Sequence, residues 1–257
     1  MRGYDIIGNI AIVKFERSDG AAKKKVFARK LMNQHKSVGT VLEKTGKFKG
    51  RLRTLKTKFI AGVNTEEAIY KENNCNFRFN VDTCYFSPRL ANERLRIAKM
   101  TKKNESVLVM FGGVAPFAIA IAKNSQVKRV ISVELSRECS RYALDNVKRN
   151  KLSGKVEIIQ GDVRKFVPKM KEKFDRIVMA RPNLKDSFLD IALGKIRKNG
   201  IIHYYGFYEE NKTNELKELI EKETKKSGKR IKIIRTKKAG DIGLRKYRYR
   251  VDFKILN

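Results

Sequence analysis

The 257 residues of this chain suffice for one large or two modest domains, and its 41% hydrophobic residues can build ordinary cores without disulfides or metals. Its apolar runs are too short to span a membrane and its N-terminus lacks the architecture of a signal peptide, so we expect a cytoplasmic globular protein. Sixty Lys and Arg against 27 Asp and Glu leave a formal net charge of +33, which predicts a polyanionic partner and salt-sensitive binding.

The first third of the chain predicts a smaller, basic α+β domain. Residues 5–13 and 77–81 have the patterns of strands, the second with clean period-two alternation. Between them, residues 23–60 combine many basic side chains with interleaved apolar ones. This spacing favours a folded segment that presents its charge over a plain solvated charge run. We therefore assign residues 1–86 to the basic domain.

A linker helix and a polar joint are predicted at 87–104. Pro88 disfavours helix before it and can open one after it, and apolar residues follow at spacings that suit a short helix. The stretch from Thr101 to Glu105 is polar and reads as the joint. The second domain is therefore expected to span 105–257.

Beyond the joint, apolar runs and amphipathic segments alternate as in a βαβ fold, which makes the chain α/β. Unbroken apolar strands suit a parallel sheet that is covered on both faces. The tail predicts a closing antiparallel pair at the sheet edge. Strands are predicted at 106–111, 129–134, 155–159, 174–180 and 200–205, and helices at 116–123, 137–150, 187–197 and 211–226.

The strongest chemical signal joins two strand ends. The first strand ends at Phe111 and leads into Gly112 and Gly113, which let a ligand approach the backbone before the next helix begins. The second strand ends at Glu134, where a carboxylate accepts hydrogen bonds from ribose hydroxyls in Rossmann-like sites. Each half also has a structural interpretation, as a tight turn or a solvent-exposed strand end. Together they predict a nucleotide-type ligand.

Two further loops follow strands of the same sheet. The third strand ends at Asp162, which could face an adenine edge, and the fourth ends at Ala180. The carboxyl ends of parallel strands are where open α/β sheets bind ligands. The predicted ligand-binding residues are Phe111, Gly113, Val114, Glu134, Leu135, Asp162, Val163, Ala180 and Pro182, and no metal-ligand cluster stands out.

The chain resembles the archaeal and eukaryotic tRNA guanine-N1 methyltransferases that modify guanosine 37, beside the anticodon. The resemblance covers nearly the whole chain. Its most specific motif is YFSPRLANER, from Tyr85 to Arg94, because a generic Rossmann-like enzyme has no reason to contain it. The other motifs are YDIIGNIAIV, KTGKFKGRLRT, MFGGVAPF, SVELS and IIHYYGF.

This resemblance implies a class I methyltransferase domain that holds S-adenosylmethionine, preceded by a basic domain that binds tRNA. It further implies that Arg53 contacts the target guanine and that Glu93 is the general base. Guanine N1 carries a proton at neutral pH, so attack on a methyl group requires a carboxylate to remove that proton. Arg53 would stabilise negative charge that develops on O6.

Each of these residues has a simpler alternative role. Arg53 could contact only phosphate, and Glu93 could be a helix ion-pair partner of its arginine neighbours. Arg89 could orient Glu93 or hold phosphate, so we assign it to RNA binding with Arg53 and Arg181. His203 lies inside an apolar strand and reads as a core histidine rather than a catalyst.

The chain departs from the family pattern at three points. Val109 replaces the acidic residue that usually begins the first cofactor motif, and Ala115 replaces a motif glycine. After the fourth strand, the family's Asn-Leu-Pro is Ala180-Arg181-Pro182, so only Pro182 carries over. The resemblance begins at the family's middle domain, and we therefore expect no counterpart of its N-terminal elbow-binding domain.

Three functions remain open on the sequence alone. The first is methylation of guanine N1 at tRNA position 37 by a monomer that needs no protein partner and no membrane. The second is a wybutosine-pathway enzyme that transfers a methyl or an aminocarboxypropyl group at the same position. The third is a tRNA-binding protein with a decayed active site. The high charge could alternatively reflect a lysine-rich proteome or an anionic membrane, although no amphipathic anchor is evident.

Overall fold

The chain divides into two compact units, Met1–Pro88 and Arg89–Asn257. The computed structural model describes residues 3–180, 186–243 and 245–257. Within these residues, no helix has both the length and the apolar character needed to cross a bilayer. The helix predicted as a linker in 87–104 is α2 (Ala91–Met100), and it lies within the second unit.

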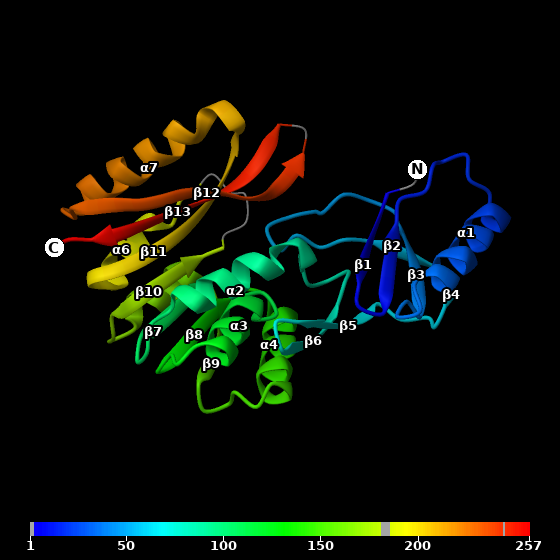
Figure 1. Cartoon of the computed structure of the whole chain (residues 1–257), viewed down its shortest axis with the longest axis horizontal. Coiled ribbons are helices and arrows are strands. Elements are labelled where there is room, and N and C mark those ends of the chain that lie inside the picture. Colours follow the sequence, from blue (N-terminus) through cyan, green and yellow to red (C-terminus); the bar gives the residue numbers. More distant parts are fainter. Residues whose placement is uncertain (1–2, 181–185, 244) are drawn as a thin grey trace. The chain divides into compact units, whose positions relative to one another are not determined.

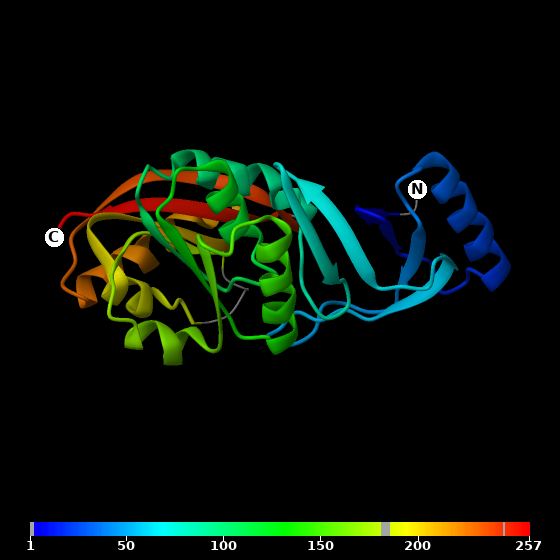
Figure 2. The same cartoon turned by 90° about the horizontal axis from the view of Figure 1, so that it is seen from below.

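The first unit contains a four-stranded sheet of order β1-β2-β3-β4 and a helix packed on it (Figure 2). The segment 5–13, predicted as one strand, is instead a hairpin. Gly8 turns the chain there with a φ of 60°, and an added Cβ would lie 1.9 Å from the carbonyl oxygen of Ile69. The elements are β1 (Tyr4–Ile7), β2 (Ile10–Val13), α1 (Ala21–Gln34), β3 (Thr40–Lys44) and β4 (Thr57–Gly62).

The basic segment 23–60 is folded and presents its charge outward. Helix α1 buries Ala28 and Leu31, which join Val13 and Val41 in a small core. Its exposed positions carry Lys23, Lys25, Arg29 and Lys30. The unit is completed by the hairpin of β5 (Glu67–Glu72) and β6 (Cys75–Asn80). The predicted strand 77–81 is therefore confirmed as β6.

The second unit is built on a seven-stranded sheet of order β12-β13-β11-β10-β7-β8-β9. The five strands from β7 to β11 run parallel, and β13 pairs antiparallel with both β11 and β12. The predicted parallel sheet with an antiparallel edge is thus confirmed. The strands are β7 (Ser106–Met110), β8 (Arg129–Glu134), β9 (Val156–Gln160), β10 (Phe174–Met179), β11 (Ile196–Glu209), β12 (Ile231–Gly243) and β13 (Lys246–Ile255).

Helices cover both faces of this sheet (Figure 1). Helices α2, α3 and α4 lie on one side, and α6 and α7 lie on the other. One large apolar core fills the α6 and α7 side and contains Leu108, Ile177, Tyr204 and Phe253. The helices are α3 (Pro116–Asn124), α4 (Arg137–Arg149), α5 (Val163–Phe166), α6 (Leu189–Lys195) and α7 (Thr213–Lys226), and short 3-10 turns lie at Pro88–Leu90, Val167–Lys169 and Glu210–Lys212.

The main error in the predicted boundaries concerns β11. The sequence predicted a helix at 187–197 and a strand at 200–205, whereas α6 ends at Lys195 and β11 runs from Ile196 to Glu209. The strand is longer because each residue from Ile201 to Glu209 pairs with a residue of β13. The paired residues lie 37 (Glu209 and Lys246) to 53 (Ile201 and Lys254) positions apart in sequence, so the pairing leaves no local signal.

Candidate active site

The turn after β7 has the unusual backbone that the sequence predicted. Phe111, Gly113 and Ala115 all have positive φ values, of 64°, 56° and 65°. A Cβ on Gly112 would lie 2.2 Å from the hydroxyl oxygen of Ser132, so a larger residue there would have to displace the Ser132 side chain. Ala115 therefore takes a left-handed conformation that glycine adopts more readily, at a cost of about 1 kcal/mol.

The turn is held from outside by the buried side chain of Asn146. Its Nδ2 donates to the carbonyl oxygen of Val114 at 3.2 Å. Pro116 then begins α3, where it has no amide hydrogen to leave unpaired. The first turn of α3 thus presents the backbone amides of a helix N-terminus beside the glycine turn.

Glu134 ties the first two strand ends together. Its Oε2 accepts from the amide of Gly113 at 2.7 Å, and its Oε1 accepts from the amide of Ser136 at 2.7 Å. Burial raises the pKa of Glu134 above its ordinary value, and the amide hydrogen bonds offset this only in part. Each oxygen has a second lone pair, so the carboxylate can still accept a hydroxyl donor such as a ribose. The acceptor oxygens of Glu134 therefore suit the nucleotide-type ligand that the sequence predicted.

The third strand end joins the same cluster. The amide of Gly161 donates to the carbonyl oxygen of Glu134 at 2.7 Å. Asp162 caps α5, because its Oδ1 accepts from the amide of Arg164 at 2.9 Å, and Val163 is buried in the first turn. On the neighbouring loop, the carbonyl oxygen of Leu135 accepts from Gln160. Three of the four predicted loops therefore meet through direct hydrogen bonds or packed backbone.

The structure describes the fourth loop at Ala180 and again from Asp186. Ala180 follows β10 directly and is partly exposed. Arg181 and Pro182 lie outside the described residues. Beyond them, Phe188 packs edge-on against Phe111 with ring centroids 5.0 Å apart. Arg164 binds both Asp186 and Asp190, which links this segment to the start of α5.

Glu93 is buried in the first turn of α2, with 6% of its surface exposed. Its partners are not the arginines of its own helix that the sequence suggested. Oε2 accepts from a guanidinium nitrogen, Nη1 of Arg250, and from the hydroxyl of Tyr205 at 3.3 Å, while Lys237 Nζ lies 3.7 Å from Oε1. The Tyr205 ring also lies 5.9 Å from that of Phe117 in the first turn of α3. One side chain therefore joins Glu93 to the helix that follows the glycine turn.

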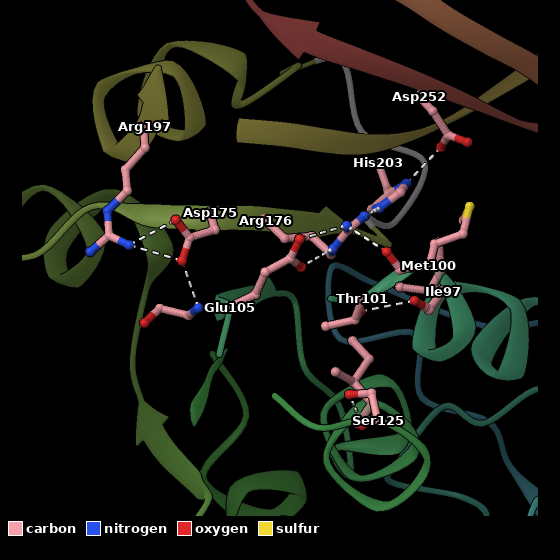
Figure 3. Close-up of polar contacts among 12 residues, drawn as sticks. Ile97, Met100, Thr101, Glu105, Ser125, Asp175, Arg176, Arg197, His203 and Asp252 are labelled. Atoms are coloured by element: carbon pink, nitrogen blue, oxygen red, sulfur yellow. Dashed lines mark hydrogen bonds and ion pairs between the residues drawn. The ribbon is translucent and has the colours of Figure 1, made fainter. Parts of the chain in front are cut away.

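Glu93 is one end of a buried polar chain, which we define as Glu93, Arg250, Asp252, His203, Arg176 and Glu105. Arg250 Nη2 donates to Asp252 at 3.0 Å, and Asp252 lies 2.6 Å from His203 Nδ1. His203 Nε2 lies 2.6 Å from Arg176 Nη1, and Arg176 donates to Glu105 at 2.7 and 3.0 Å. Figure 3 shows Arg176 between Glu105 and His203, with Asp252 beyond the histidine.

The protonation of His203 follows from its two partners. Burial lowers the pKa of His203 below its ordinary value, although Asp252 opposes the shift. A neutral ring that accepts from Arg176 at Nε2 must carry its proton at Nδ1, where it donates to Asp252. Burial would raise the pKa of Asp252, but the hydrogen bond from His203 and the charge of Arg250 lower it. His203 is thus a satisfied core histidine, as predicted.

The predicted RNA-binding residues lie in different parts of the chain. Arg53, in the first unit, has a φ of 55° and places its guanidinium 3.9 Å from the ring centroid of Tyr85. Arg89 is exposed in the 3-10 turn at Pro88–Leu90 and begins the second unit. Arg181 lies outside the described residues.

The sequence did not single out four residues of this cluster, Arg250, Asp252, Arg176 and Tyr205. A local signal existed, because charged residues interrupt the apolar alternation of YRYRVDF and FDRIVM. The local sequence could not show which of these residues pair across neighbouring strands. His203 lies opposite Asp252 and Tyr205 opposite Arg250 across two strands, so the polar side chains meet on one face of the sheet.

Substitution of Glu134 by Gln tests the ligand role of this carboxylate. Loss of one charged acceptor should weaken S-adenosylmethionine binding by about tenfold or more, since a hydrogen bond to a charged group contributes about 1.5–3 kcal/mol. Because the pKa of Glu134 is raised, native affinity should also fall as the pH is lowered into the weakly acidic range. Titration calorimetry measures both effects. Glu138→Gln is the control, and an unchanged dissociation constant for Glu134→Gln would contradict the role.

Two family models match the chain. The TRM5/TYW2 methyltransferase domain matches residues 68–234, and the TYW2 N-terminal domain matches residues 1–65. The first match includes α2, the glycine turn and the first five strands of the large sheet, and reaches into β12. It therefore spans every site residue described above in the second unit except those on β13 and the last part of β12.

Individual proteins are similar over nearly the whole chain. The tRNA (guanine(37)-N(1))-methyltransferase Trm5b of Pyrococcus abyssi is 36% identical over 98% of this chain and 74% of its own. Its crystal structure superposes with a TM-score of 0.87 and 34% identity over 99% of this chain and 75% of that one. The tRNA (guanine(37)-N(1))/4-demethylwyosine(37)-methyltransferase Taw22 of Nanoarchaeum equitans is 32% identical over 98% and 99%. The crystal structure of M. jannaschii TYW2 in complex with AdoMet has a TM-score of 0.75 and 26% identity over 99% and 100%.

Proposed function

We propose that this chain, which belongs to the TRM5/TYW2 methyltransferase family, methylates N1 of guanine 37 in tRNA, with Glu93 as the general base. The observation that carries the proposal is the position of Tyr205. It contacts Glu93 through its hydroxyl and Phe117 through its ring, so a carboxylate and the helix behind the glycine turn belong to one packed cluster. This contact supports the proposal, because a general base has to lie close to the bound methyl donor and within hydrogen-bond reach of the proton that it removes.

Members of the family share the fold class and the cofactor. The predicted α/β class, a Rossmann-like methyltransferase domain with a separate smaller domain before it, is confirmed. S-adenosylmethionine is the cofactor and supplies a methyl group on a positively charged sulfur. The residues present suit it, because Glu134 can accept from ribose hydroxyls and the glycine turn offers backbone amides. Phe111, Val114, Leu135, Asp162, Val163 and Ala180 are proposed to line the same site, as is Pro182.

In the proposed mechanism, Glu93 removes the proton from guanine N1 as the methyl group arrives. The N1 proton would pass to the Glu93 carboxylate. The electron pair of the broken N–H bond would form the new bond to the methyl carbon as the bond from that carbon to the sulfur of S-adenosylmethionine breaks, which would leave a neutral thioether. Arg53 stabilises the negative charge that develops on O6, where a guanidinium donor is suited to an oxygen acceptor. Arg89 and Arg181 are proposed to bind the RNA backbone.

The turn after β7 argues against the decayed-site alternative. Ala115 keeps the left-handed conformation that the motif needs, and Val109 is a fully buried strand residue rather than a gap in the site. A turn that has lost its ligand has no need to retain three residues with positive φ, each of which costs about 1–3 kcal/mol when it is not glycine. These backbone conformations favour a working site over a decayed one.

A second substrate is favoured by one specific observation. The Nanoarchaeum equitans relative, which this chain matches over 99% of its length, is named for methylation of both guanine and 4-demethylwyosine. The tricyclic base also lies at position 37, so the same carboxylate and cofactor would serve. Transfer of an aminocarboxypropyl group remains the other wybutosine-pathway alternative for the same site.

Methyl transfer to unmodified tRNA separates these functions. The chain should incorporate labelled methyl groups from S-adenosylmethionine into a tRNA transcript that carries G37. Nuclease digestion and mass spectrometry should then identify 1-methylguanosine at that position. A transcript with A37 is the control and should stay unlabelled. Label on another base, transfer of the aminocarboxypropyl group, or tRNA binding without transfer would each contradict the proposal.

A further inference from the structure

Helix α2 is fixed to the sheet at both of its ends by the buried polar chain. In the first turn, Glu93 meets Arg250 of β13 and Tyr205 of β11. At the last residue, the carbonyl oxygen of Met100 accepts from Arg176 Nη2 of β10 at 2.7 Å. Both arginines are fully enclosed, with at most 1% of their surface exposed. Removal of one partner from such a buried pair is strongly destabilising, because it leaves the other charge without compensation.

The two groups that donate hydrogen bonds to Glu93, on Arg250 and Tyr205, keep their protons. Burial alone would lower the pKa of Arg250, but Tyr205, Asp252 and Glu93 together raise it above its ordinary value. Burial and the neighbouring charge of Glu93 raise the pKa of Tyr205 far above its ordinary value. Arg250 therefore always carries its charge and Tyr205 always carries its proton, and both donate to the same oxygen, Oε2.

The guanidinium is itself held in place. Asp252 accepts from Arg250 Nη2, and His203 fixes Asp252 from the other side. A planar guanidinium with two acceptors at fixed positions has one orientation, whereas an ammonium group at the same place could contact its acceptors only as a point charge. The orientation of the carboxylate therefore depends on the fork of Arg250 as well as on its charge.

We infer that Arg250 is a positioning residue for methyl transfer: with Tyr205, it occupies Oε2 of Glu93 so that Oε1 is the atom that accepts the N1 proton. Oε1 faces Lys237 Nζ at 3.7 Å, beyond hydrogen-bond distance, and the Lys237 side chain is 32% exposed. The two oxygens are thus unequal. This inference rests on the proposed role of Glu93 as general base.

The matched variants are Arg250→Lys and Arg248→Lys. Arg248 lies two residues earlier on the same strand, is 8% exposed and has its guanidinium over the Phe207 ring. Arg250→Lys keeps the charge and removes the fork, so kcat at saturating tRNA should fall about tenfold, because small misplacements of a catalytic group are costly. KM for tRNA, the dissociation constant of S-adenosylmethionine and the urea midpoint should each stay near native values. Arg248→Lys should leave kcat unchanged.

Combination with Glu93→Gln shows whether Arg250 acts through the base. In the Glu93→Gln background, Arg250→Lys should cause no further loss, because residues that act as a unit are not additive. If Arg250→Lys lowers the urea midpoint, Tyr205→Phe gives the same test, since it removes only the second donor to Oε2. It should lower kcat about fivefold, with the same lack of additivity, as a hydrogen bond contributes about 1 kcal/mol.

The outcomes separate this inference from the function on which it rests. A slow Glu93→Gln enzyme together with native kcat in Arg250→Lys and Tyr205→Phe overturns the positioning role alone. Losses that multiply with Glu93→Gln, or that appear in KM for tRNA, also overturn it. Native turnover in Glu93→Gln would instead overturn the proposed role of Glu93 as general base, whatever the results for the other variants.

Discussion

Substitution of Glu93 by Gln is expected to reduce turnover of tRNA by about 10²-fold or more, because a positioned general base typically contributes 10²- to 10⁴-fold. Glutamine matches glutamate in shape but cannot take the proton from guanine N1. It can still accept from Tyr205 and Arg250 through its amide oxygen, so the packing of α2 should survive. The measurement is single-turnover methyl transfer at saturating S-adenosylmethionine, with tRNA affinity determined in parallel.

If Glu93 is the general base, the loss of turnover in Glu93→Gln must come from the chemical step. We expect the affinities for tRNA and for the cofactor to change by no more than about twofold. Slower turnover with unchanged binding is typical of a group that acts only in the transition state. Glu218→Gln, an exposed glutamate on α7, is the matched control and should be fully active. Native turnover in Glu93→Gln, or a loss that follows weaker tRNA binding, would rule out the base role.

Substitution of Arg176 by Met should lower the stability of the second unit by about 3–5 kcal/mol, the usual cost of removing one partner of a buried ion pair. Arg176 is 1% exposed and donates to Glu105, to His203 and to the carbonyl oxygen of Met100. Methionine fills most of the volume but removes the donor from the buried His203 and from the partly buried Glu105 carboxylate and Met100 carbonyl. Urea unfolding followed by circular dichroism measures the change, and hydrogen exchange of β10 and β11 peptides locates it.

Arg197 provides the control, because it also contacts both carboxylate oxygens of an acidic residue, but this ion pair lies on the surface. Its Nη1 lies 2.8 Å from both carboxylate oxygens of Asp175, and its side chain is 46% exposed (Figure 3). An exposed pair of this kind contributes about 0–1 kcal/mol, so Arg197→Met should change the urea midpoint little. Equal effects for the two variants would show that the buried polar chain does not stabilise the unit.

Local sequence patterns predicted the strand ends that we propose as the ligand-binding edge of the sheet. The run of apolar residues that ends at Phe111, the following glycines and the proline that begins α3 together specify a strand, a turn and a helix within a short stretch. Glu134 could be predicted in the same way, because a strand end is visible as the last residue of an apolar run. These features depend on backbone conformation and on periodicity, which neighbouring residues set among themselves.

The partners of Glu93 could not be predicted in that way. The sequence placed this residue on a short helix among Arg89, Arg94 and Arg96, and therefore suggested an ion pair within the helix. The structure instead pairs it with Arg250, which is 157 residues away along the chain. Strand β13 brings the two together because it pairs antiparallel with β11, a long-range pairing that no local pattern specifies.

The sequence by itself determined the α/β class, the order of strands and helices in the second unit, and the strand ends that carry Gly113, Glu134 and Asp162, since all of these follow from side-chain periodicity and turn chemistry. Only the tertiary structure decided which charged residues are buried together. Arg176, His203 and Arg250 lie on three strands and meet because the register of the sheet places them on one face, and a register is a property of paired strands rather than of any one of them.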